Sequence, residues 1–149
     1  MTDYTWHIPD PDTQPEFYRD VPVKRLVAWI VDTILVALLC VLILPFTAFT
    51  GLFFFPLLLL VVGFAYRVIT IANGSATIGM RLMAIEFRTA TGQRFDLAMA
   101  LVHTTAFTVS CGFVVVQAIS IVLMMTTARA QGLTDHLLGT VAVNRRANM

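Results

Sequence analysis

The chain has 149 residues, of which 58% are hydrophobic and only 13% are charged, and its mean hydropathy is +0.80. Soluble domains carry about 25% charged residues, so this composition excludes an ordinary water-soluble globule. The net charge of +1 offers no basic surface for a nucleic-acid partner. We therefore expect one domain, whose core is helix against helix within a lipid bilayer.

Residues 1–23 differ in composition from the rest of the chain. They hold four of the six prolines and five of the nine acidic residues, and they lack the basic-then-apolar order of a signal peptide. A segment of this kind has too few apolar side chains to form a core, so we expect a disordered cytosolic tail.

Residues 24–44 predict a first membrane helix. The stretch 26–44 is nineteen residues long, about the length that crosses a hydrocarbon core, and Asp32 is its only charged residue. A carboxylate at that depth costs about 3 kcal/mol or more, so it marks a buried polar site. Arg25 lies close to two turns earlier on the same face, roughly 10 Å away along the axis. Asp32 is then either a proton or cation carrier, or a structural group paired with Arg25, Arg67 or a hydroxyl.

Residues 52–72 predict a second helix that forms a transmembrane hairpin with the first. The connection 45–51 has no charged residue and begins with a proline, which ends the first helix. Near the end of the second helix, Tyr66 and Arg67 resemble an interface anchor. Arg67 is about 22 Å from the helix start, so its side chain is expected to reach the membrane surface.

The stretch that follows predicts a small extended element. Residues 81–87 partly alternate between apolar and polar, and a turn signal follows at 89–92, which together favour a short cytosolic β-hairpin or an interfacial segment. The sequence Val-Ala-Val at 141–143 predicts a further short strand near the C-terminus.

Residues 97–127 form a third apolar block of thirty-one residues, too long for one ordinary crossing and short for two. Gly112 lies near its middle, so the block is either one kinked helix or a helical hairpin. His103 lies in its most polar stretch, where a histidine can relay protons or simply pack through hydrogen bonds. The fold class is thus an all-α membrane protein with a short strand element.

The positions of the basic residues predict the topology. None of the ten lysines and arginines falls in 45–51 or at Gly112. The positive-inside rule then favours an even number of helical legs with both termini in the cytosol. The alternative is three crossings with the C-terminus outside, because each half of 97–127 is only about 23 Å long.

The arrangement of Arg25 at the start of the first helix and Asp32 within it resembles the RDD family of small integral membrane proteins, which is named for one Arg and two Asp. The second Asp corresponds to Asp135, in a closing segment at 134–143 that contains Gly-Thr and a valine-rich strand. The sequence Thr-Ile-Gly-Met-Arg-Leu at 77–82 is similar to the family's Thr-x-Gly-Lys-x-Leu link.

The resemblance divides the chain into the tail at 1–23, a membrane domain at 24–144 and a basic tail at 145–149. It implies residence in the bacterial inner membrane as a multi-pass protein with a cytosolic N-terminus. Membrane transport is the activity usually suggested for the family, without an established substrate. His103 stands where many relatives have an arginine, and His136 follows Asp135 where many relatives have a histidine before the acid.

A polar seam is the candidate site, and we assign Arg25, Asp32 and Asp135 to it. The side chains expected to support it are Arg67, Arg81, His103 and His136. For Asp135 the alternative is a cap, because Thr134 or Asp135 can bond the open amides of a following helix. We expect no metal and no cofactor, since His136 has no second His or Cys near it and both cysteines lie within apolar runs.

Two functions fit this seam. The first is transport of a small ion or solute, in a homo-oligomer, because few short helices enclose little volume. The second is a non-catalytic accessory or assembly subunit that docks a larger membrane protein. Motifs of hydrolases, nucleotide-binding loops and metalloproteases are missing, so we expect no enzyme, and the expected partners are the bilayer and other membrane proteins.

Overall fold

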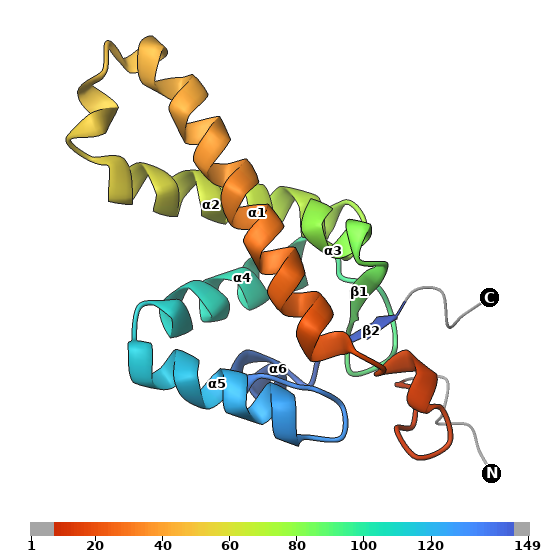
Figure 1. The fold of residues 1–149 in the computed structure, drawn as a ribbon. Helices are drawn as coiled ribbons and strands as arrows, with labels where there is room; N and C mark the ends of the chain where they lie inside the picture. The colour runs from red at the N-terminus through yellow and green to blue at the C-terminus, as the bar shows by residue number, and fades with distance from the viewer. Residues whose placement is uncertain (1–7, 145–149) are drawn as a thin grey trace.

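The structure, a computed structural model, describes residues 8–144 and is mainly helical (Figure 1). The all-α membrane class predicted from the sequence is confirmed. In chain order the helices and strands are α1 (Val21–Ile43), α2 (Phe55–Ala72), α3 (Ile78–Leu82), β1 (Ile85–Arg88), α4 (Leu97–Cys111), α5 (Val114–Thr126), α6 (Leu133–Leu138) and β2 (Val141–Asn144). Short 3₁₀ turns occur at Pro15–Phe17, Leu44–Thr47 and Thr50–Leu52.

Helices α1 and α2 are each long and apolar enough to cross a membrane. Each has a proline in its first turn, where the missing N–H costs no intrahelical hydrogen bond. Helix α2 begins at Phe55, three residues later than predicted, because residues 50–52 form a 3₁₀ turn in the connection. The apolar side chains of α1 and α2 remain exposed along much of both helices, as expected of surfaces that face lipid.

The third apolar block forms two helices with a sharp bend between them. The chain turns by 117° between α4 and α5, at Gly112. The Ser110 hydroxyl donates a hydrogen bond to Gln117 Oε1 across the bend, with an O···O distance of 2.9 Å. The break lies at Gly112, as both sequence alternatives placed it, and the geometry is that of a broken span or a re-entrant loop.

One end of the molecule gathers the start of α1, the short helix α3 and the two strands, away from the α1–α2 connection (Figure 1). Strand β1 pairs antiparallel with β2, from Ile85 opposite Asn144 to Arg88 opposite Val141. The predicted local hairpin at 81–92 is therefore wrong. Residues 78–82 are helical, and the turn after β1 leads into α4, so the pairing strand comes from the far end of the chain.

The described part of the tail, residues 8–20, is packed and not disordered as predicted. Phe17 and Tyr18 are buried against Val141 and Val143 of β2. Asn144 fixes the same segment, because its Nδ2 donates to the carbonyls of Glu16 and Arg19 at 2.8 and 2.9 Å. The expectations for residues 1–7 and for the basic tail at 145–149 lie outside the described residues.

Candidate functional site

The first polar cluster surrounds Asp135, at the third position of α6. The carboxylate accepts hydrogen bonds at both oxygens. Arg25 Nη1 lies 2.6 Å from Oδ2, and the amide of Gly132 donates to the same oxygen at 3.2 Å. His103 Nε2 lies 2.9 Å from Oδ1 of Asp135, and the Thr140 hydroxyl donates to the same Oδ1 at 2.8 Å. One carboxylate thus joins α1, α4, α6 and the residue before β2.

Asp135 is completely buried, and so is His103, whose ring packs against the stacked pair of Phe87 and Phe95. Burial by itself raises the pKa of Asp135, but the Arg25 guanidinium and the His103 ring outweigh it and hold the pKa well below its usual range. All strong acceptor positions of Asp135 are therefore occupied by protein groups. We interpret this cluster as a lock between segments, with no position left for a ligand.

The depressed pKa of Asp135 predicts how the lock responds to acid. A carboxyl whose pKa is lower in the folded state stabilises the fold fully above its unfolded pKa, about 3.9, and loses this contribution as pH falls toward the folded value. The gap in melting temperature between the wild type and Asp135→Asn should therefore be constant from about pH 7 to about pH 5 and narrow below about pH 4. A gap that widens on acidification would contradict this assignment.

The second polar cluster surrounds Asp32, in the middle of α1. The Tyr66 hydroxyl donates to Oδ1 at 2.6 Å, the Thr77 hydroxyl donates to Oδ2 at 2.6 Å, and the amide of Gly79 donates to Oδ1 at 2.9 Å. Within residues 8–144, no ion pair or hydrogen bond joins Asp32 to Arg25. The predicted single seam is therefore two clusters, and Asp32 has the hydroxyl partners that the sequence left as one alternative.

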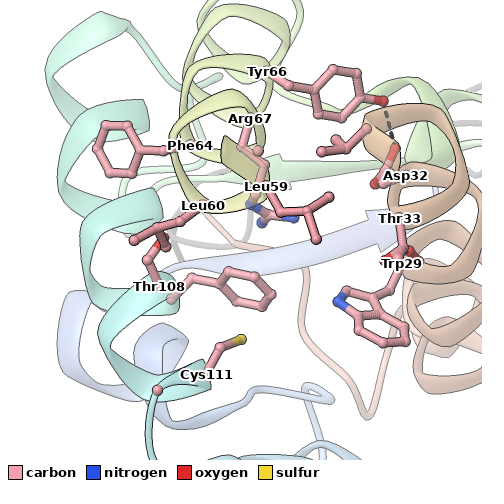
Figure 2. A pocket seen from close by; sticks show the side chains of 14 residues that line it. Trp29, Asp32, Thr33, Leu59, Leu60, Phe64, Tyr66, Arg67, Thr108 and Cys111 are labelled. Atoms are coloured by element: carbon pink, nitrogen blue, oxygen red, sulfur yellow. Dashed lines mark hydrogen bonds between the residues drawn. The ribbon is translucent and has the colours of Figure 1, made fainter. Parts of the chain in front are cut away.

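A groove of about 370 Å³ opens between α1, α2 and α4 beside Asp32 (Figure 2). Its polar lining includes Asp32 and Arg67, and most of the rest is apolar or aromatic. The predicted surface anchor is wrong for both of its residues. Tyr66 is buried on Asp32, and Arg67 lies in the groove lining with its guanidinium carbon 4.0 Å from the centre of the Phe107 ring.

The remaining predicted residues have local roles. Arg81 donates to the carbonyls of Thr70 and Ala76 near the end of α2, at 2.9 and 3.2 Å. The His136 ring bonds the Gly132 carbonyl within its own helix at 2.9 Å. Neither Thr134 nor Asp135 is the cap residue of α6, because the cap position is Gly132, whose amide bonds the Asp135 carboxylate.

The sequence did not predict several residues of the two clusters and the groove, namely Tyr66 as a partner of Asp32, Thr77, Gly79, Phe107 and Thr140. The sequence could have predicted the role of Thr77. A Thr two residues before a Gly, in a link between helices, can hold a carboxylate with its hydroxyl and with the exposed amide of the Gly. The role of Phe107 had no such signal, because phenylalanine is common in apolar helices.

Comparison with known proteins places this geometry in a family. The RDD family model matches residues 21–139, which include both polar clusters and most of the chain. No curated protein and no solved structure gives a significant match. Of the three residues that suggested the family, Arg25 and Asp135 belong to the first cluster and Asp32 is the centre of the second. Since the match spans far more than half of the sequence and the helices suit a bilayer, the chain is an integral membrane protein belonging to the RDD family.

Proposed function

We propose that this protein binds a small ion or solute in the groove between α1, α2 and α4 and carries it through the membrane. The observation that supports the proposal is the groove itself, which brings Asp32 of α1 and Arg67 of α2 to the wall of one cavity of about 370 Å³. Ligand sites typically have volumes of about 300–1,000 Å³, mostly apolar walls and a few polar groups, and this groove has all three properties.

The position of the groove along the helices favours transport. Arg67 is five residues from the end of α2, about 8 Å, and Asp32 is eleven residues into α1, about 17 Å. Ionisable groups at such depths within a membrane are rare and usually belong to a substrate or proton path. The Asp135 lock does not compete for this role, because its carboxylate is fully occupied.

We propose that two helices cross the inner membrane and that α4 and α5 enter it and return. Lys24, Arg25, Arg81, Arg88 and Arg94 belong to the end that holds β1 and β2 (Figure 1). The positive-inside rule favours the cytosol for that end, with the N-terminus on the same side. Cysteine labelling of engineered terminal positions in intact and permeabilised cells tests this orientation.

Transport is tested by reconstituting the purified protein into liposomes loaded with a pH-sensitive dye and imposing gradients of NaCl, KCl or sodium gluconate. We expect proton or ion flux in at least one gradient, reduced about tenfold or more by Asp32→Asn, since that change removes the charge and keeps the shape. Asn can still accept from Gly79 and Tyr66 through its amide oxygen, so the fold should persist.

The matched control is Asp96→Asn, because Asp96 is an exposed helix cap that bonds the amide of Met99 and lies outside the groove. It should leave flux unchanged. Flux that is absent in every gradient, or equal in Asp32→Asn and the wild type, contradicts the transport proposal. A partner protein that co-purifies in stoichiometric amount would favour the accessory role in its place.

A further inference from the structure

The Arg67 guanidinium is a cation without an anion. Among residues 8–144 it makes no hydrogen bond or ion pair, and its Nε is buried without a partner. Its guanidinium carbon lies 4.0 Å from the centre of the Phe107 ring. An unpaired charge away from water is costly, and a cation over a ring recovers only about 2 kcal/mol. Arg67 therefore brings a full positive charge and guanidinium N–H donors without protein partners to the groove lining.

Asp32 forms no direct ion pair with Arg67. Both residues line the groove, but no oxygen of Asp32 comes within 4 Å of the Arg67 nitrogens, the distance that defines an ion pair. Three of its four acceptor positions already receive hydrogen bonds from Tyr66, Thr77 and Gly79. The charge of Arg67 is thus available to a group that enters the groove.

The groove is polar at one end and apolar at the other. Along α2 its lining runs from Arg67, through Phe64 and Gly63, to Leu60 and Leu59. From position 67 to position 59 the helix rises about 12 Å, away from the end of the molecule that holds the two strands. In the view of Figure 2 the Arg67 guanidinium lies beside Leu59, and Trp29 of α1 and Cys111 of α4 belong to the other walls of the groove.

We propose that the ligand of this groove is an anionic amphiphile, whose carboxylate or phosphate head pairs with Arg67 and whose apolar part lies along Leu59 and Leu60. The inference rests on the proposed binding function of the groove and narrows its ligand class. Charge complementarity selects the head, since a fork of N–H donors suits the two oxygens of a carboxylate or phosphate. The open apolar side of the groove selects a molecule that is already in the bilayer.

Trp29 in the groove wall offers a direct readout of binding. The chain has two tryptophans, so Trp6→Phe leaves Trp29 as the only one. The purified protein in detergent is titrated with a brominated fatty acid, which quenches a tryptophan that it touches, and with the methyl ester of the same acid. We expect saturable quenching by the acid and at least tenfold weaker apparent binding of the ester.

Arg67 is then changed in this background. Arg67→Gln should weaken apparent binding of the acid tenfold or more, and Arg67→Lys should restore part of it. Arg67→Gln should not lower the melting temperature of delipidated protein, because it removes an unpaired charge. Arg81→Gln is the matched control, since Arg81 is an exposed arginine near the same end of α2 and bonds only carbonyls; it should leave binding unchanged.

The source of the head group is separated by a second pair of probes, brominated phosphatidylglycerol and brominated phosphatidylcholine in mixed micelles. Arg67-dependent quenching by the free acid supports a carboxylate ligand, and Arg67-dependent quenching by phosphatidylglycerol alone supports an anionic lipid. Equal quenching by acid and ester, or by the wild type and Arg67→Gln, overturns the inference. If the wild type binds the probes through Arg67 but gives no liposome flux, the transport function alone is refuted. If it gives flux but the quenching does not depend on Arg67, this inference alone is refuted.

Discussion

Replacing Asp135 with asparagine is expected to lower the free energy of unfolding by about 3–5 kcal/mol. The substitution leaves the Arg25 guanidinium, whose side chain is only 13% exposed, without an anion at its end of α1. It also removes the charged acceptor of His103 and Thr140. Breaking a buried pair on one side costs more than the pair contributes, because the remaining charge is stranded.

The test measures the melting temperature in detergent, with the fraction of protein that stays monodisperse on heating as the signal. Asp12→Asn is the matched control, since Asp12 is exposed, and it should melt with the wild type. The double change Arg25→Gln with Asp135→Asn should be milder than the sum of the two single changes, because the stranded charge disappears. Additive effects would show that Arg25 and Asp135 are not coupled.

The second large effect is expected at Gly79, whose amide holds Asp32. A Cβ at this position would lie 2.3 Å from the carbonyl oxygen of Ala28 and 2.8 Å from Asp32 Oδ1. The first neighbour is helix backbone, which cannot move without breaking α1, so Gly79→Ala must push α3 away from α1. That displacement removes the hydrogen bonds from Gly79 and Thr77 and leaves a carboxylate poorly paired, which we expect to cost about 3 kcal/mol or more.

Gly63→Ala is the matched control for this substitution. Its added Cβ would lie 3.7 Å from the nearest side-chain atom of Val36, an ordinary contact, so the change should leave the melting temperature nearly unaltered. Infrared or NMR signals of the Asp32 carboxyl provide a second readout, because they should shift in Gly79→Ala and not in Gly63→Ala. A Gly79→Ala protein with wild-type stability would mean that α1 and α3 approach less closely than described.

The separation of the two acids changes how the family's charged residues are understood here. Arg25 and Asp135 form one pair that closes the start of α1 onto α6, and Asp32 belongs to another cluster that closes α1 onto α2 and α3. The first pair uses charge against charge, whereas the second uses three neutral donors. The groove lies beside the second cluster, so the structural and proposed binding roles meet at Asp32 and Arg67.

Hydropathy and helix punctuation were sufficient to predict α1 and α2 and to place a break at Gly112. Long apolar runs between prolines or small polar residues have few alternatives in lipid, since only a helix satisfies its own backbone there. The same local rules failed for 78–88, because the helix α3 is short and β1 pairs with a strand more than fifty residues away. They failed for residues 8–20 because Phe17 and Tyr18 gain their order only from β2.

The sequence by itself determined that this is a helical membrane protein with charged residues inside its apolar segments. The length of an apolar segment and the free-energy cost of a carboxylate in the hydrocarbon core are local properties. Only the tertiary structure decided which partners those charges have. Arg25 pairs with Asp135 across the chain and not with Asp32 on its own face, and Arg67 enters the groove instead of reaching the surface. Such choices depend on how α1, α2, α4 and α6 pack, and helical spacing along one segment carries no information about that packing.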